Sequence, residues 1–255
     1  MDKLFLAIGV FVGALVDDTF GQVLPPIQLD RPDQTECPFI TPSKYFQLET
    51  GIVIENTNSE LKNYSHPTML LKYGINEKFE LRLITELVTV KNRDYSTTGI
   101  NPITVGIKTS LLEEIGLIPK ISFIGHITTS NVGSKEFETK YIAPSFRFSM
   151  QHTLTEKISL AYNLGAEWDG DMAGHTYIYT FTTGFSLTEK LGAYVEVYGF
   201  FPNDYQSDQR FDCGFTYLLS NDFIVDISGG IGLTENAPNN YLALGLSYRF
   251  NTAKK

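Results

Sequence analysis

Charged residues are scarce in this chain. Asp, Glu, Lys and Arg make up 19% of its 255 residues, and the 29 acidic residues outnumber the 20 basic ones. The net charge of −9 argues against a nucleic-acid-binding protein, which would present a basic face. Two cysteines are too few for a disulfide framework. Beyond the N-terminal segment no window approaches the roughly 18 uncharged apolar residues of a membrane helix.

Aromatic residues, by contrast, are abundant. They reach 13% of the chain, and 18 Phe and 14 Tyr supply all of them except one Trp. Together with a hydrophobic content of 42%, this excludes an intrinsically disordered chain, which cannot bury enough apolar surface to fold. The length suits one large β domain or two small domains.

The N-terminus resembles a secretory leader. A basic residue, Lys3, precedes the apolar run Leu4–Val16, which is too short to cross a bilayer as a helix but suits the core of a signal peptide. We therefore predict a signal peptide over residues 1–21, in preference to a buried N-terminal strand or helix. Its removal leaves an exported chain that is still acidic, with a net charge of −7.

Residues 22–43 are rich in proline and have no apolar periodicity. They hold five of the eleven prolines, which predicts an extended periplasmic arm before the main domain. Cys37 lies in this arm and Cys213 in a later strand. A disulfide between them is geometrically possible, but the sequence gives no distance that would support it. Isolated thiols are favoured, as is usual for unpaired cysteines.

From residue 44 to residue 251 the pattern changes to alternation with a period of two. We count twelve such segments, which predicts strands with one apolar face. The last segment is the clearest, with Leu242, Leu244 and Leu246 alternating with small residues before Phe250. Residues 252–255 remain as a C-terminal tail. The domains expected are thus a signal peptide, an arm, a β domain and this tail.

The connections between the predicted strands alternate in length. The short connections are residues 76–78, 155–157, 188–190 and 221–222, and the longer polar ones are residues 56–66, 91–101, 130–140, 169–174 and 203–209. Alternating short and long connections indicate consecutive hairpins and an even number of strands.

The alternation fits either a soluble β fold or a membrane barrel with its apolar face outward. Three features favour the barrel. The polar face carries few charges, the strands run about 10 to 12 residues, which is enough to cross a bilayer at a tilt, and aromatics crowd the strand ends. Those aromatics are Phe79, Trp168, Phe185, Phe201, Phe211, Phe223, Tyr248 and Phe250.

The predicted fold is therefore an all-β, transmembrane, antiparallel up-and-down β-barrel of about 12 strands. Backbone groups must not be left unpaired in hydrocarbon, so the strands close on themselves. We expect the outer membrane of a Gram-negative bacterium, with the N- and C-termini periplasmic. Expected partners are outer-membrane lipid, a small-molecule solute and the barrel assembly machinery, and no nucleic acid. Phe250 resembles the terminal aromatic of such barrels, although five residues follow it.

The charges of the inward register are the candidate lumen residues. They could select solutes by charge and size at a constriction, or they could pair across the interior and plug it. Tyr194 and Tyr198 flank Glu196 and could stack against an aromatic solute, although Tyr is also an ordinary lumen filler. The full set of candidates is Glu80, Arg82, Glu86, Lys108, Arg147, Glu167, Tyr194, Glu196, Tyr198 and Arg249.

Motifs of catalysis and of metal or cofactor binding are absent from the sequence. There is no phosphate-binding glycine loop, HExxH, CxxC or GxSxG. Four histidines, at positions 66, 126, 152 and 175, are too far apart to suggest a metal site. We expect no enzyme, metal or cofactor. An outer-membrane lipase using Ser122 and His126 is disfavoured, because His126 falls on the predicted lumen face.

One stretch of the chain resembles a known family. The run Leu29-Asp30-Arg31-Pro32-Asp33-Gln34-Thr35-Glu36, then Pro42 and Phe46-Gln47-Leu48-Glu49-Thr50-Gly51, resembles the opening of outer-membrane transporters named for the meta-pathway of phenol degradation. The resemblance implies a porin-like barrel that passes small molecules, including aromatic or hydrophobic ones.

The motif Asp30-Arg31-Pro32-Asp33 within that stretch also has a physical interpretation. Arg31 between two carboxylates, stiffened by Pro32, could pair with charges at the periplasmic mouth or inside the lumen. A solvated tether is the alternative. The function predicted from sequence is an outer-membrane channel with a polar, charge-lined lumen. The alternative is a non-conducting barrel that binds partners or anchors the envelope.

Overall fold

The structure is a computed structural model that describes residues 24–203 and 205–252. The predicted signal peptide lies outside the described residues, as do the last three residues of the predicted tail. The elements are β1 (Tyr45–Asn56), β2 (Lys62–Asn76), β3 (Phe79–Lys91), β4 (Ser96–Ile100), β5 (Thr104–Leu112), β6 (Lys120–Thr128), the 3-10 helix η1 (Lys135–Phe137), β7 (Ala143–Thr153), β8 (Ile158–Glu167), β9 (Thr176–Ser186), β10 (Leu191–Pro202), β11 (Asp208–Ser220), β12 (Phe223–Gly232) and β13 (Asn240–Asn251).

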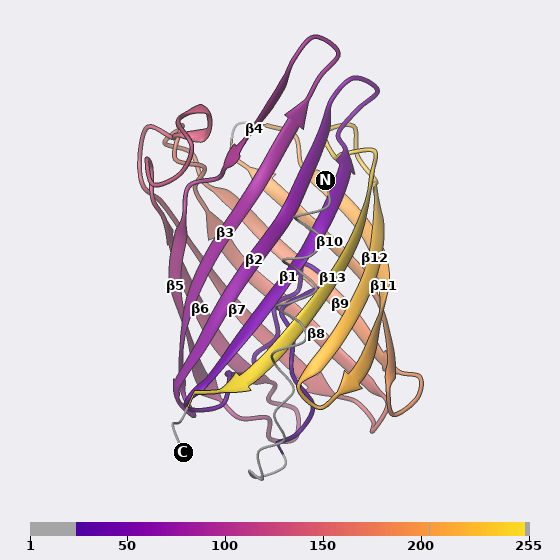
Figure 1. The fold of residues 1–255 in the computed structure, drawn as a ribbon. Coiled ribbons are helices and arrows are strands. Elements are labelled where there is room, and N and C mark those ends of the chain that lie inside the picture. The colour runs from indigo at the N-terminus through magenta and orange to yellow at the C-terminus, as the bar shows by residue number, and fades with distance from the viewer. Residues whose placement is uncertain (1–23, 204, 253–255) are drawn as a thin grey trace, which may run out of the picture.

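The strands form one closed antiparallel sheet (Figure 1). Apart from β4 and β5, consecutive strands pair with each other, and the first strand, β1, pairs with the last, β13, along its whole length. The two short strands β4 and β5 both pair with β3, one with its end and one with its beginning, so they act as one interrupted strand. The interruption contains Pro102, which has no amide hydrogen to donate to a ladder. With β4 and β5 counted as one, the barrel has twelve strands around its circumference, which confirms the predicted fold.

Parts of two predicted connections are strands in the structure. The predicted connection 56–66 is too long, because β2 already begins at Lys62 and includes His66. Likewise, β4 occupies part of the predicted connection 91–101. These stretches lack apolar alternation, yet their backbones continue the hydrogen-bond ladder beyond the apolar band. Pro67 interrupts the ladder on both sides of β2.

The two faces of the barrel differ as the alternation predicts. On β5, Ile107 is 40% exposed whereas its neighbour Lys108 is fully buried. Exposed apolar side chains follow one register of the strands, and polar side chains of the alternate register, such as Glu80, Lys108 and Asp212, are buried. This is the reverse of a soluble β fold, and it gives the outer surface the apolar band that a bilayer requires.

Aromatic rings gather where the first and last strands meet. Phe46 of β1 lies 4.7 Å from Tyr73 of β2 and 5.8 Å from Phe250 of β13, measured between ring centroids. Tyr248 continues this cluster to Phe223 of β12. Rings of this kind suit the boundary between lipid and water, as the sequence predicts for the strand ends.

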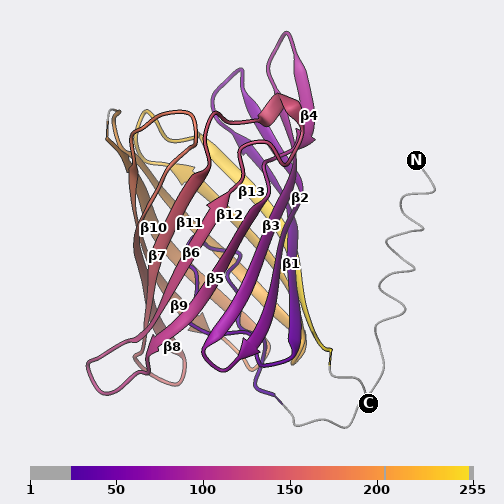
Figure 2. The same ribbon diagram turned by 90° about the vertical axis from the view of Figure 1, so that its left-hand side faces the viewer.

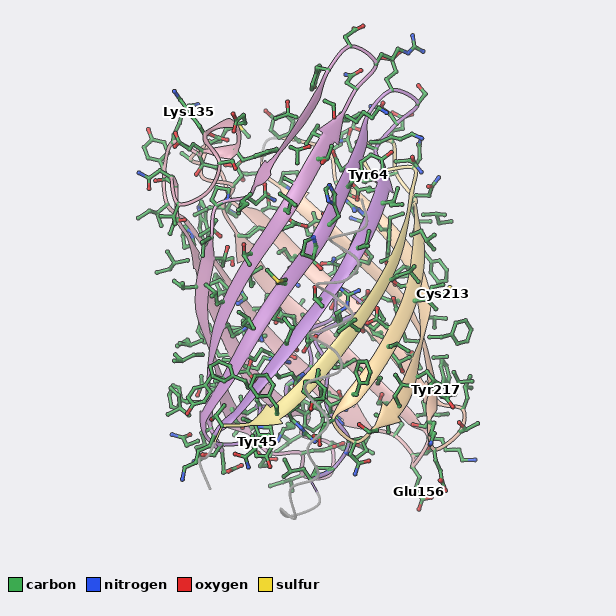
Figure 3. The ribbon with its side chains drawn as sticks, viewed as in Figure 1. Tyr45, Tyr64, Lys135, Glu156, Cys213 and Tyr217 are labelled. Carbon is green, nitrogen blue, oxygen red and sulfur yellow. The ribbon has the colours of Figure 1, made fainter. Side chains whose placement is uncertain are left out.

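The barrel has two different ends. The short turns lie at one end, marked in Figure 3 by Tyr45 and Glu156, and the longer connections lie at the other, marked by Tyr64 and Lys135. We call these the turn end and the loop end. The C-terminal strand finishes at the turn end (Figure 1). Within the described part of the chain, no helix is long and apolar enough to cross a membrane.

Candidate functional site: the lumen and its arm

The proline-rich arm lies inside the barrel. It enters from the turn end, reaches about the middle of the lumen and returns to the turn end to begin β1, as the indigo segment in Figure 2 shows. On the way in, the carbonyl of Leu24 accepts a hydrogen bond from Asn221 in the turn between β11 and β12. On the way out, the backbone amide of Thr41 donates to Glu80 near the start of β3. The arm is thus a folded insert and not a solvated tether.

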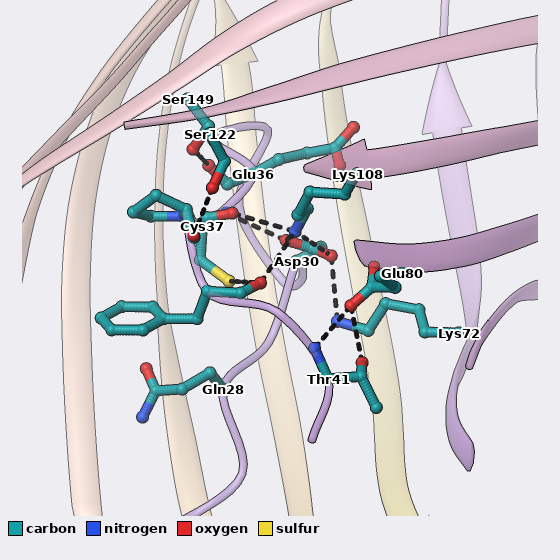
Figure 4. A network of polar contacts seen from close by, with 12 residues as sticks. Gln28, Asp30, Glu36, Cys37, Thr41, Lys72, Glu80, Lys108, Ser122 and Ser149 are labelled. Atoms are coloured by element: carbon teal, nitrogen blue, oxygen red, sulfur yellow. Dashed lines mark hydrogen bonds and ion pairs between the residues drawn. The ribbon is translucent and has the colours of Figure 1, made fainter. Parts of the chain in front are cut away.

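Asp30 is the main anchor of the arm. Its carboxylate is 2.7 Å from the amine of Lys108 and 2.9 Å from that of Lys72 (Figure 4). It is also 2.9 Å from the guanidinium of Arg82. Burial alone would raise its pKa, but Lys108, Lys72 and Arg82 together hold the pKa of Asp30 well below its ordinary value. The carboxylate of Asp30 is therefore ionised and fully paired.

The strands that bind Asp30, β2, β3 and β5, form one wall of the lumen, and this wall and the strands after it also hold the returning half of the arm. Glu36 forms a salt bridge with Arg82, and its backbone amide and carbonyl both bond to the side chain of Asn163. The carbonyl of Pro38 accepts a hydrogen bond from Ser122. Side chains of β2, β3, β5, β6, β7 and β8 thus bind the arm. Extended backbone needs such partners because it has no hydrogen bonds of its own.

Arg31 extends from the arm to the strands that close the barrel. Its guanidinium makes two hydrogen bonds to Asp226 of β12, at 3.1 and 3.0 Å. It rests against Gly51 and Gly245, which face each other on β1 and β13. A Cβ atom at Gly245 would lie 2.2 Å from the guanidinium, so only glycine leaves room for this contact. Of the two predicted placements, Arg31 pairs inside the lumen.

The wall made by β9, β10 and β11 meets the arm differently. Glu196 of β10 accepts hydrogen bonds from the backbone amide of Gln34 and from the hydroxyls of Thr35 and Thr182. Asp212 of β11 accepts one from the hydroxyl of Tyr241. These carboxylates have hydroxyl and amide partners where those of the opposite wall have cations.

Asp33 stands on the tip of the arm and faces this second wall. Burial, Glu196 and Asp212 raise its pKa well above the ordinary value, because three carboxylates share one region of low polarity. Asp30 and Asp33 are thus shifted in opposite directions although they belong to the same short motif.

Two cavities flank the tip of the arm. The larger, about 650 Å³, lies toward the loop end, and the smaller, about 450 Å³, lies toward the turn end. They share Arg31, Pro32 and Asp33 as lining residues. The lumen is therefore neither open nor filled: it is divided at the arm tip into two chambers.

The structure places all of the candidate lumen residues on the inner side of the barrel. Those buried against the arm or the wall are Glu80, Arg82, Lys108, Tyr194, Glu196, Tyr198 and Arg249. Those lining the loop-end cavity with Tyr198 are Glu86, Arg147 and Glu167. Arg249 lies apart from the others, because it pairs with Asp222 at the turn end.

Sequence reasoning left out several residues of the same lumen. They are Glu49, Lys72, Asn163, Asp212 and Asp226, all of which are buried on the inner face. Each stands in the polar register of its strand, so the alternation itself could have found them. What the alternation does not carry is their pairing with the arm.

The structure does not assemble the Ser122 and His126 pair that the sequence offered for a lipase. Ser122 donates to the carbonyl of Pro38, and His126 accepts a hydrogen bond from Arg82, so these two do not form the Ser-His pair of a lipase. No group of three metal-binding side chains was found among the described residues. Cys37 and Cys213 are both free, the first in the lumen and the second on the exposed outer face.

A closed barrel with an apolar exterior and a polar, subdivided interior defines the class of membrane-spanning β-barrels. Solved structures share this fold. An outer membrane channel from Pseudomonas putida F1 matches with a TM-score of 0.65 and 13% identity, over 83% of this chain and 97% of that chain. The KdgM porin in complex with disordered oligogalacturonate matches with a TM-score of 0.57 and 10% identity, over 80% and 99%. The NanC porin matches with a TM-score of 0.56 and 10% identity, over 80% and 98%.

The sequence itself identifies the family. The family described as "Putative MetA-pathway of phenol degradation" matches residues 29–250, and the chain belongs to it. This confirms the resemblance seen at the arm and the first strand. No curated protein matches the sequence.

Proposed function

We propose that this protein is an outer-membrane channel for small molecules, in which the arm narrows the passage. The observation that carries the proposal is the pair of cavities that meet at Arg31, Pro32 and Asp33 inside a closed barrel. A solute that enters the loop-end cavity would pass the arm tip to reach the turn-end cavity. Charges and tyrosines line both sides of that step, which is how barrel channels discriminate among solutes.

The location in the membrane follows from the surface. The apolar band needs lipid, and a closed barrel leaves no backbone edge unpaired within it. In our proposal the turn end, with both ends of the described chain, faces the periplasm, and the longer connections face outward. The channel and porins that share the fold support a location in the outer membrane, and the family description suggests aromatic solutes.

A non-conducting barrel remains the second candidate, and one observation favours it. The arm is anchored by the buried cluster around Asp30, in which Lys72, Lys108 and Asp30 are each at least nine-tenths buried. A buried ion network of this kind resists displacement, because breaking it leaves charges unpaired. Such a barrel would bind partners or anchor the envelope instead of passing solutes.

Planar bilayers separate the two candidates. The purified full chain should give small, stable conductance steps in potassium chloride, and liposomes that contain it should take up uncharged solutes of low mass. The matched control is protein-free lipid carried through the same detergent. Neither conductance nor uptake, from protein that retains its folded mobility on a gel, would overturn the channel proposal.

A further inference from the structure

The second wall contains negative charge without matching positive charge. Asp33, Glu196 and Asp212 lie together where the arm tip meets β10 and β11, and Glu196 and Asp212 face each other in register. Among the residues that the structure describes, none of these three carboxylates forms a salt bridge, and Arg210 nearby is engaged with Glu55 and Asp208. The opposite wall, by comparison, gives Asp30 three cations.

Hydrogen bonds satisfy only part of this acidic group. Glu196 has donors from the arm and from β9, so its charge is supported. Asp212 is fully buried and receives one hydrogen bond from a hydroxyl, that of Tyr241, while its Oδ1 has no N–H or hydroxyl donor and its carboxyl interacts directly with that of Glu196. A buried carboxylate oxygen without such a donor is destabilising.

A second unpartnered polar atom points to the same place. Tyr194 of β10 is only 7% exposed, and its hydroxyl has no hydrogen-bond partner. That hydroxyl is within electrostatic range of Asp212, Asp33 and Glu196. Its ring lies across Gly214, whose missing side chain makes the space for it. Tyr194 and Asp33 both line the turn-end cavity, whereas Asp212 is fully buried and lines neither cavity, so the lumen reaches the group at Tyr194 and Asp33.

We propose that Asp33 and Tyr194 form a subsite for the protonated amino group of a solute, strengthened by the buried negative charge of Asp212. The inference rests on the proposed channel function and names the charge of what passes. An ammonium group has donors and no acceptor, which suits the carboxylate of Asp33 and the unpartnered hydroxyl of Tyr194 as acceptors. The neighbouring tyrosine rings can add cation–π attraction. A metal ion fits less well, because these residues do not have metal-binding spacing.

Reversal potentials and block by an amine test this subsite. In a potassium chloride gradient the wild-type barrel should prefer potassium over chloride. Benzylamine, which is protonated at pH 7, should reduce the potassium current at concentrations at which benzyl alcohol, its neutral counterpart, does not. The double variant Asp33→Asn/Asp212→Asn should weaken the block by about tenfold or more, as expected for the loss of charge-assisted hydrogen bonds. Tyr194→Phe removes one hydroxyl and should weaken it less.

The matched control is Glu189→Gln, an exposed carboxylate in the turn between β9 and β10, which should leave the block unchanged. Equal block of the wild type and of the double variant would overturn the subsite while leaving the channel intact. A wild-type preference for chloride would do the same. If the barrel conducts nothing, the channel proposal fails by itself, and calorimetric titration of the folded barrel with benzylamine decides the subsite. Absence of heat in the wild type would then overturn it.

Discussion

The two walls of the lumen hold the same arm by different chemistry. From β2 to β5, buried lysines and an arginine neutralise the carboxylates of the arm, and these ion pairs are buried. From β9 to β11, hydroxyls and a backbone amide support carboxylates that have no cation. Asp30 and Asp33 experience this contrast directly, with their pKa values shifted in opposite directions. The first wall anchors the arm through salt bridges, and in our proposal the second wall binds a cation from the solute.

The largest effect is expected from breaking the first wall. Asp30→Asn removes the carboxylate shared by Lys72, Lys108 and Arg82, so the free energy of unfolding should fall by about 3 to 5 kcal/mol, as for other broken buried ion pairs. The conductance should rise at the same time, because the arm loses its anchor. Denaturant titration in lipid vesicles, followed by the fluorescence of the single Trp168, measures the first effect.

Asp94→Asn, which changes an exposed carboxylate in the hairpin between β3 and β4, is the control and should alter neither quantity. If Asp30→Asn were as stable as the wild type, the ion network would not be what holds the arm.

A smaller loss is expected where the arm crosses between the walls. A methyl group at Gly245 would displace the guanidinium of Arg31 from Asp226, so Gly245→Ala should cost about 1.5 to 3 kcal/mol, the value of hydrogen bonds to charged groups. The same substitution at Gly229 would place the Cβ atom 3.3 Å from the carbonyl oxygen of Tyr241 and away from any charged side chain, so it serves as the control. Equal stability of the two variants in the denaturant titration would contradict the role assigned to Arg31.

The second wall should be more tolerant. Thr35→Val removes one of the three donors to Glu196, and we expect the free energy of unfolding to fall by about 1 kcal/mol, the usual value of one hydrogen bond. Thr35→Ser keeps the hydroxyl and should restore the wild-type value. A loss as large as that of Asp30→Asn would show that both walls hold the arm equally.

The smallest effect concerns pH. A carboxyl group with a raised pKa, such as Asp33, favours the folded state when it is protonated, and this contribution is lost as the pH rises through its folded value. Asp30 behaves in the opposite way: its stabilisation is present above its ordinary pKa and is lost only as the pH falls far below it. Over the pH range that spans the raised pKa of Asp33, the preference for potassium should therefore decline as the pH falls, while the arm stays anchored.

Reversal potentials at several pH values measure this decline. Asp33 faces Glu196 from β10 and Asp212 from β11, so Asp33→Asn should reduce the pH dependence without removing all of it. A wild-type reversal potential that is constant over this range would show that Asp33 does not titrate there.

The sequence predicted the barrel because lipid on one side and polar contacts on the other impose a period of two. It also placed the candidate lumen charges on the correct face, since Lys108 and Ile107 are neighbours that must point in opposite directions. The arm has no periodicity, so its partners could not be predicted. Which inward residues meet, such as Glu196 and Asp212, depends on the stagger between strands, and a single sequence does not reveal that stagger.

The path of the arm has a consequence for assembly. Its entry beside Asn221 and its exit beside Glu80 lie at the same mouth of the barrel. The arm is therefore a loop that enters and leaves the lumen at the same end. It does not pass through the barrel from one end to the other. It can fold into place after the cylinder has closed, and it can be withdrawn by the same opening without parting any pair of strands.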